Sequence, residues 1–169
     1  ASSKLNTKKM CGIFWIVGGT DEAYKAAVTR WEKLSGQTTV MLDLTLPAQG
    51  DYTPYVLKAR DSGCDAVVMN TVEPQIVQMI KTADAQSITG INWLFLAPGY
   101  TEQVAKALAD TKQQIYVGTE WEPYTDSNSK ANEAWKAAMT EAKMPLTAFT
   151  QGGFEAATIL IDVLKSIDG

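Results

Sequence analysis

The sequence predicts a doubly wound α/β fold, in which a five-stranded parallel sheet of order 2-1-3-4-5 carries helices on both faces as a three-layer sandwich. Apolar, β-branched runs alternate strictly with amphipathic stretches, the pattern of parallel strands joined by helical crossovers. The second run places polar residues at alternate positions, which is typical of a half-buried strand at a sheet edge. Right-handed crossovers, combined with that edge strand, favour the order 2-1-3-4-5.

The first strand and helix have clear boundaries. Residues 10–17, "MCGIFWIV", form a continuous apolar run that predicts a strand buried on both faces. Residues 21–35 then repeat apolar side chains at helical spacing. Thr20 is expected to be the N-cap, and Gly36 stands where a C-cap glycine belongs.

The second strand is predicted over residues 38–46. Its side chains divide between two faces, with Val40, Leu42, Leu44 and Leu46 on one and Met41, Asp43 and Thr45 on the other. The strand is therefore expected to be half-buried at an edge of the sheet.

The rest of the chain continues the alternation. Gly63 ends a short helix, and the third strand, "DAVVMN", precedes a helix with Pro74 at its first position. A strand over 91–97, a helix capped by Thr101 and a strand over 114–119 follow. Two more helices are expected at about 130–142 and 153–167. The last should be well packed, because it is rich in apolar residues: Phe154, Ile159, Leu160, Val163 and Leu164.

Composition bounds the class of protein. A chain of 169 residues with 46% apolar and 20% charged residues predicts one ordered domain, residues 1–169. The formal net charge of −4 argues against nucleic acid or an anionic membrane surface as partner. No apolar run reaches the length of a membrane span, and no signal peptide is recognised at the start. Because the chain begins with Ala1, a mature product or an excised piece is expected.

Several kinds of chemistry have no support in the sequence. There is no histidine, which removes the usual general base and the commonest metal ligand. The turn "VGGTDEAY" lacks a G-x-G-x-x-G pattern and a Walker lysine, and no G-x-S-x-G elbow occurs. Two cysteines are too few for a zinc site. We therefore expect no enzyme activity, no cofactor and no metal.

The two cysteines leave a choice open. Cys11 begins the first strand, and Cys64 lies at the amino end of the third, which this topology places beside the first. The thiols are then close enough for a disulfide. Two buried, reduced thiols are the alternative.

Polar and aromatic residues gather in the loops at the carboxyl ends of the strands, where open parallel sheets bind ligands. These residues are Tyr24, Tyr52, Asn70, Thr71, Glu73, Tyr100, Trp121 and Tyr124. Aromatic rings with a few hydrogen-bonding groups are typical of a small-molecule binding wall. Each has a structural alternative: Trp121 can cover the end of the sheet, and Glu73 suits the positive end of a helix.

An ordered series of segments resembles the second lobe of type I periplasmic solute-binding proteins, in particular the branched-chain amino acid receptors of ABC transporters. The segments are "DEAYKAAVTRWEKLSG", "QGDYTPYVLKARDSGCDAVVMNTVEPQIVQMIKTA", "FLAPGY" and "QIYVGTEWEPY". The ending "FTQGGFEAATILIDVLKSI" resembles the helix that precedes the return crossover between the lobes.

The resemblance implies a periplasmic or extracellular receptor whose two lobes close on a small molecule and deliver it to an ABC permease. Tyr24 matches a first-loop aromatic that lines the pocket, and Thr71 and Glu73 match a strand end that contacts the ligand. Amino-acid receptors usually place an acid in the loop that reads "APGY" here. Tyr100 and Trp121 instead suit an apolar or aromatic ligand. Without the first lobe, binding by this chain alone is expected to be weak or absent.

Two other functions remain open at this point. The same fold serves as a ligand-sensing domain of receptors or regulators, which a neighbouring effector domain would indicate. An α/β enzyme of the hydrolase or flavodoxin type is less well supported, since the residues of neither chemistry occur.

Overall fold

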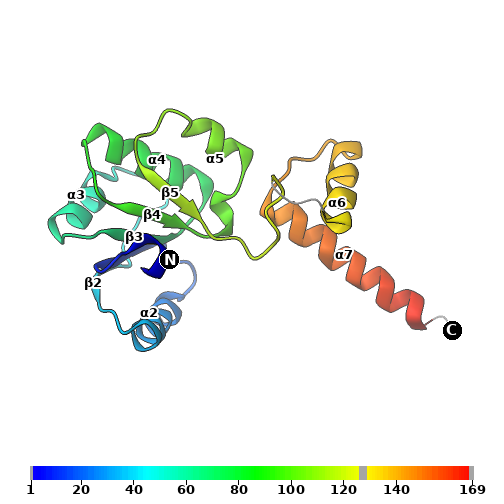
Figure 1. Ribbon diagram of the computed structural model, residues 1–169, viewed down its shortest axis with the longest axis horizontal. Coiled ribbons are helices and arrows are strands. Elements are labelled where there is room, and N and C mark those ends of the chain that lie inside the picture. The colour runs from blue at the N-terminus through cyan, green and yellow to red at the C-terminus, as the bar shows by residue number, and fades with distance from the viewer. Residues whose placement is uncertain (1, 126–128, 168–169) are drawn as a thin grey trace.

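The computed structural model describes residues 2–125 and 129–167, and its centre is one five-stranded parallel sheet. The sheet order is β2-β1-β3-β4-β5, as predicted, and every neighbouring pair runs parallel (Figure 1). The strands are β1 (Met10–Phe14), β2 (Thr39–Asp43), β3 (Ala66–Asn70), β4 (Asn92–Phe95) and β5 (Gln114–Val117).

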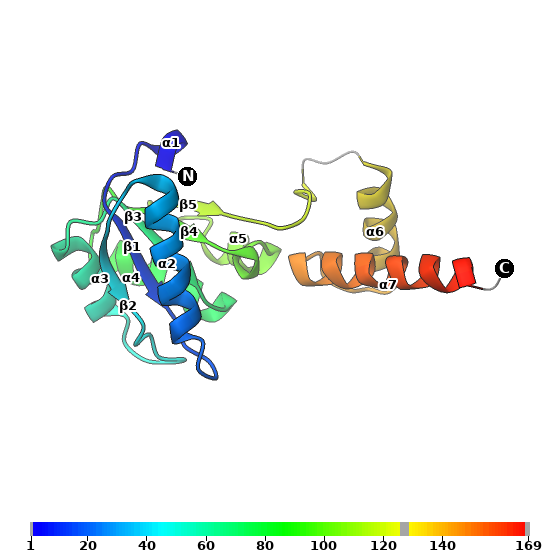
Figure 2. The ribbon, with the colours of Figure 1, turned by 90° about the horizontal axis from the view of Figure 1, so that it is seen from below.

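Helices cover the two faces of the sheet unequally. α2 lies on one face, whereas α3 and α4 lie on the other (Figures 1 and 2). α6 and α7 stand apart from the sheet, beyond the carboxyl ends of β4 and β5. The helices are α1 (Ser2–Leu5), α2 (Asp21–Ser35), α3 (Thr53–Asp61), α4 (Glu73–Ala85), the short 3₁₀ helix η1 (Ala97–Gly99), α5 (Glu102–Ala107), α6 (Lys130–Glu141) and α7 (Ala148–Ile167).

The helix ends follow the sequence signals in most places. The Thr101 hydroxyl accepts a hydrogen bond from the Val104 amide at 3.2 Å and so caps α5. Gly36 ends α2 with φ of 67°, a left-handed conformation that glycine adopts without strain. Thr20 occupies the N-cap position of α2, but its hydroxyl accepts from the Val17 amide behind it instead of capping the helix.

The buried core lies between the sheet and the α3–α4 layer. On that face, β1, β3 and β4 contribute side chains that are at most 1% exposed: Ile13, Val67, Met69, Trp93 and Phe95. Helices α3 and α4 pack against them with buried side chains: Val56, Ala59, Ile76, Met79, Ile80 and Ala83. Apolar side chains from both layers therefore exclude water from this face.

Two strands differ from the sequence-based expectation. β1 ends at Phe14, so residues 15–17 leave the sheet and Val17 is exposed. In β2 the buried residues are Met41 and Asp43, whereas Val40 is exposed. The alternation of β2 predicted that Val40 and Leu42 would be the buried side chains. The side chains that face α3 are instead covered more completely than those that face α2. Asp43 tolerates burial there because Lys58 and Thr45 bond its carboxylate.

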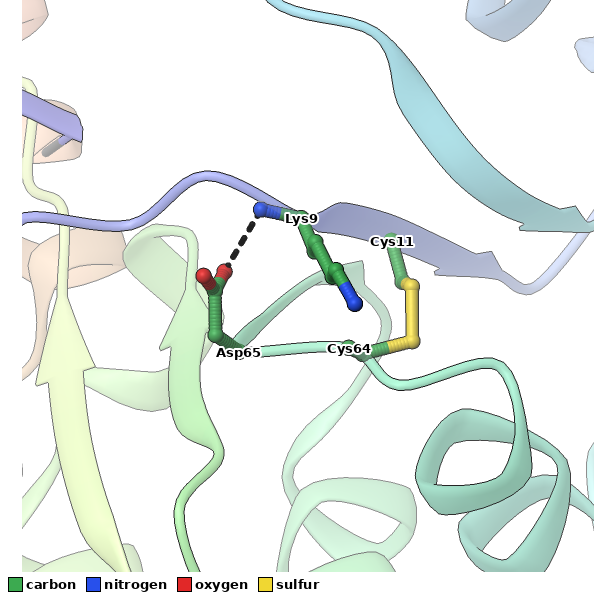
Figure 3. Close-up of a disulfide and its surroundings, with 4 residues drawn as sticks. All are labelled: Lys9, Cys11, Cys64 and Asp65. Carbon is green, nitrogen blue, oxygen red and sulfur yellow. Dashed lines mark hydrogen bonds between the residues drawn. A yellow bond between two sulfur atoms is a disulfide. The ribbon is translucent and has the colours of Figure 1, made fainter.

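The amino ends of β1 and β3 are joined covalently. Of the two states that the sequence left open for the cysteines, the structure has the disulfide between Cys11 and Cys64 (Figure 3). Beside it, the Asp65 carboxylate accepts hydrogen bonds from the backbone amides of Lys8 and Lys9, at 2.7 and 2.9 Å. The disulfide and the carboxylate together fix the start of β1 against β3.

The expectation that the last helix is well packed is wrong. α7 extends over twenty residues, and only Ala148 and Gln151, in its first turn, are buried. Its apolar side chains from Ile159 to Ile167 are about half exposed or more, because no other described element packs against that part of the helix. Within the described ranges, no helix is both long enough and apolar enough to cross a membrane.

Candidate functional site

The carboxyl edge of the sheet brings the predicted loops together. Phe14 pairs in register with Asn70, and Phe95 pairs with Met69 on one side and Val117 on the other. The segments that follow β1, β3, β4 and β5 therefore leave the sheet beside one another. Because the strands are parallel, all of these loops emerge on one edge.

Tyr24 and Asn70 form the best-defined polar pair on this edge. The Asn70 side-chain amide donates to the Tyr24 hydroxyl at 2.7 Å. The Tyr24 ring stacks on Phe14, with centroids 4.6 Å apart and planes 3° from parallel. The first turn of α2 thus presents Tyr24 to the end of β3, and stacking and hydrogen bonding together fix its ring.

Thr71 lies in the same loop but turns inward. The residue is buried, and its hydroxyl donates to the Gln75 side-chain oxygen, which also accepts from the Val72 amide. The Gln75 nitrogen donates to the Pro47 carbonyl at 2.8 Å. The buried Gln75 side chain thus connects the end of β3 and the start of α4 to the loop after β2. Thr71 and Gln75 therefore hold these loops in place at the carboxyl edge of the sheet.

Tyr52, another member of the predicted wall, belongs to the core. It is 1% exposed, and its hydroxyl donates to the carbonyls of Pro47 and Ala48. Burial raises the pKa of this phenol. Its role is to hold the loop after β2 in place.

Tyr100 belongs to a second group of aromatic residues, and Glu73 lies near this group. The rings of Tyr100 and Tyr124 are 4.5 Å apart, and Tyr124 meets Trp135 of α6 edge-on at 5.5 Å. Burial raises the pKa of Tyr124, and the nearby Tyr100, Glu102 and Glu73 add to that shift. This aromatic group joins α6 to the end of β4, and Glu73 also lines a groove of about 650 Å³ beside α4 and α5.

Trp121 belongs to neither group. Its indole covers Gly152 of α7, where an added Cβ would lie 2.8 Å from the ring. Trp121 lines a cavity of about 490 Å³ between the 120–122 segment, α6 and α7. The eight predicted wall residues are therefore divided. Tyr24 and Asn70 are joined directly, whereas Tyr52 and Thr71 are buried and bond other residues. Tyr100 contacts Tyr124 with Glu73 nearby, and Trp121 packs on α7.

Sequence reasoning missed two residues of this edge. Trp15 directly follows β1, is partly buried, and its amide donates to the Asn70 carbonyl at 3.5 Å. A strand of the usual five residues starting at Met10 would have ended at Phe14 and placed Trp15 in the loop. Gln75 was signalled by its spacing of four residues from Thr71, which lets a first-turn amide reach back to a hydroxyl.

The arrangement can stack and hydrogen-bond a ligand. Among the described residues, no cluster of histidine, cysteine, aspartate or glutamate has the arrangement of a metal site, and the sequence contains no histidine. The edge residues supply aromatic surface, an amide and a phenol, groups that are able to orient a small molecule.

A family model described as "Periplasmic binding protein" matches residues 17–169. No curated protein has a sequence that matches this chain significantly.

Several solved structures share the fold of this chain. The leucine-binding protein LivK of Thermotoga maritima is 14% identical, with a TM-score of 0.76 over 98% of this chain and 47% of its own. LivJ of Streptococcus pneumoniae, in complex with isoleucine, is 15% identical, with a TM-score of 0.74 over 95% and 45%. A solute-binding protein of R. palustris, in complex with 4-hydroxybenzoate, is 14% identical, with a TM-score of 0.71 over 94% and 44%.

At these identities the structures establish a common fold, and this chain spans about half the length of each of them. The family model covers nearly the whole chain from Val17 onward, including the loops of the carboxyl edge. The chain therefore belongs to the periplasmic binding protein family.

Proposed function

We propose that this chain is the ligand-binding lobe of an extracytoplasmic solute receptor that delivers a small molecule to an ABC importer, and that it performs no catalysis. The observation that carries the proposal is the Tyr24–Asn70 pair, stacked on Phe14 at the carboxyl edge of the sheet. Family membership supports the receptor class. The length of the related structures supports a partner lobe that closes over this edge.

The disulfide supports an extracytoplasmic location. Disulfides persist in oxidising compartments and are rare where glutathione and thioredoxin keep thiols reduced. Cys11 and Cys64 are both buried and bonded to each other. A buried structural bridge of this kind fits the periplasm or the cell exterior.

The ligand we propose is apolar or aromatic. One related structure holds isoleucine and another holds 4-hydroxybenzoate, so the ligand class has to be argued from this chain's own residues. Phe14, Trp15 and Tyr24 offer aromatic surface, and Asn70 offers a neutral amide. The loop at Tyr100 has no acid for a ligand ammonium group. Glu73 supplies an acid at the first turn of α4, after the end of β3.

A metabolite screen by isothermal titration calorimetry tests the proposal, using the two-lobed protein that contains this chain. Asn70→Ala and Tyr24→Phe should each weaken binding about tenfold, because each removes one hydrogen bond near the ligand. Lys33→Ala, at an exposed position of α2, is the matched control and should bind normally. Unchanged affinity in both test variants would remove this edge from the ligand site.

Two further results would overturn parts of the proposal. Binding of leucine, isoleucine or valine that is abolished by Glu73→Ala would replace the apolar ligand with an α-amino acid. Micromolar binding of the ligand by the 169-residue chain alone would contradict the need for a second lobe, since one lobe makes half the contacts and excludes little water. Turnover of any screened compound would contradict a purely binding role.

A further inference from the structure

A cavity of about 200 Å³ lies between α2 and the sheet, next to the Tyr24–Asn70 pair. Its walls come from β1, β3 and α2, and they include Gly12, Phe14, Tyr24, Val28, Trp31 and Val68. None of the residues lining it is charged. It lies on the face of the sheet that α2 covers, and its lining also includes Cys11 of the disulfide. Tyr24, which the proposed function places in the ligand site, is one of its walls.

The cavity exists because α2 covers the sheet without filling the space beneath it. None of the fifteen residues of α2 is fully buried, whereas α4 buries five on the other face. The floor is formed by Gly12, which contributes no side chain. A Cβ at Gly12 would lie 2.7 Å from the Phe14 ring and 3.0 Å from Leu42, so glycine is what lets the Phe14 ring lie over this position.

The walls are held in place by contacts already described. Phe14 stacks on Tyr24, and the Tyr24 hydroxyl is bonded by Asn70 at 2.7 Å. Trp31 contributes a third aromatic ring from the next turns of α2. A pocket with fixed aromatic walls loses little conformational entropy when it is occupied.

Size and polarity indicate what can occupy the cavity. The cavity is half open to solvent, and its volume of about 200 Å³ between apolar walls is large enough for one aromatic ring. A carboxylate or ammonium group would lose its hydration there without gaining a partner, which is strongly unfavourable. The occupant must therefore present an uncharged ring or a comparably small apolar group.

We propose that this cavity binds the uncharged ring of a small aromatic molecule, with Tyr24 and Asn70 meeting the molecule's polar substituent at the carboxyl edge. That this aromatic molecule is the receptor's ligand rests on the proposed function. The cavity as a ring-binding site stands on its own lining.

The first test uses indole as the probe and the 169-residue chain, with saturation-transfer NMR to detect binding. Val28→Phe places a ring into the cavity from α2 and should weaken indole binding about tenfold or more. Thr29→Phe adds the same side chain at an exposed neighbouring position outside the lining and should leave binding unchanged. Val68→Phe fills the cavity from β3, and circular dichroism checks that each variant folds.

Failure of the inference and failure of the proposed function give different results. No indole binding by the wild-type chain, or indole binding by Val28→Phe and Val68→Phe that is as strong as by the wild type, overturns the cavity site, whatever the two-lobed receptor does. In the two-lobed protein, Val28→Phe should also weaken binding of the natural ligand, whereas Thr29→Phe should leave that binding unchanged. If the natural ligand binds Val28→Phe as tightly as Thr29→Phe but loses affinity in Asn70→Ala, the receptor's ligand site does not include the cavity. That result overturns the claim that the cavity holds the receptor's ligand.

Discussion

The two faces of the sheet are built from the same strands, yet one is closed and the other is open. In register across the sheet, Ile13, Met69 and Phe95 face α4 and are at most 1% exposed. One residue earlier in each strand, Gly12, Val68 and Leu94 face the other way, where Val68 and Leu94 are only half-buried. Tyr116 of β5 continues that row and is 38% exposed.

The difference lies in the helical layers. α3, α4 and α5 form a continuous cover on the closed face, whereas α2 is the sole helix of the described chain that lies over the open one (Figures 1 and 2). The closed face supplies the stability of the sheet, since buried apolar area dominates folding free energy. The open face carries the cavity and Tyr24. Four predictions test this division, ordered from the largest expected effect to the smallest.

The disulfide on the closed face should give the largest effect. Replacing both cysteines, Cys11→Ser with Cys64→Ser, should lower the free energy of unfolding by roughly 4 kcal/mol, because the bridge closes a long loop in the unfolded chain. The cysteines are 53 residues apart in sequence. Urea unfolding followed by circular dichroism measures the loss. A change below about 1 kcal/mol would show that the bridge adds little to an already complete core.

Truncating one apolar side chain on each face sharpens the comparison. Ile80→Ala, in the buried face of α4, should destabilise the protein by about 3 kcal/mol through lost burial and a cavity. Val28→Ala, on half-buried α2, should cost less than about 1 kcal/mol. Thermal and urea unfolding of both variants measure the two values. Equal losses would mean that α2 seals its face as completely as α4 does.

The acid dependence of stability tests the buried carboxylate on the closed side of β2. Burial alone would raise the pKa of Asp43, but hydrogen bonds from Lys58 and Thr45 outweigh it and hold the pKa below its ordinary value of 3.8. A lowered folded-state pKa means that this stabilisation is present above the unfolded value and is lost as pH falls through the folded one.

Asp43→Asn should therefore be less stable than the wild type near neutral pH by about 2 kcal/mol, and the gap should narrow as pH falls below 4. Urea midpoints measured from pH 7 to 3 give the comparison. Asp110→Asn, at an exposed position, is the control and should follow the wild-type curve. A gap that stays constant with pH would mean that the Asp43 charge contributes nothing.

The smallest effect is expected on α7. Leu160 and Leu164 are 59% and 54% exposed, so Leu160→Glu and Leu164→Glu should each change the free energy of unfolding by less than about 0.5 kcal/mol. Both variants should also be more soluble, because an exposed apolar surface is reduced. Differential scanning calorimetry and light scattering measure these properties. A loss above about 1 kcal/mol would place α7 against a covering element in solution.

Local signals in the sequence predicted most of the elements and their order. Gly36 and Thr101 mark helix ends by their backbone and side-chain chemistry, which depends on a few neighbouring residues. The continuous apolar runs of β3 and β4 predicted central strands, and the alternation of β2 predicted an edge strand. Short-range patterns suffice for these features, because each one is determined within a single element.

The candidate site was predictable only as a set of loops. Parallel strands bring their carboxyl ends to one edge, so the sequence could place Tyr24 and Asn70 near each other. It could not foresee that Gln75, beneath Thr71, reaches the Pro47 carbonyl, or that Trp121 packs on Gly152 of α7. Those outcomes depend on side-chain rotamers and on contacts between segments thirty or so residues apart, which no local periodicity encodes.

By itself, the sequence determined the fold class and the strand order, since apolar periodicity is a property of the chain alone. The tertiary structure decided which face of each strand is covered. Met41 and Asp43 are buried and Val40 is exposed because α3 and α4 lie on their side of the sheet. It also left the apolar residues of α7 exposed and a cavity under α2, since burial depends on which surfaces meet and not on how apolar each one is.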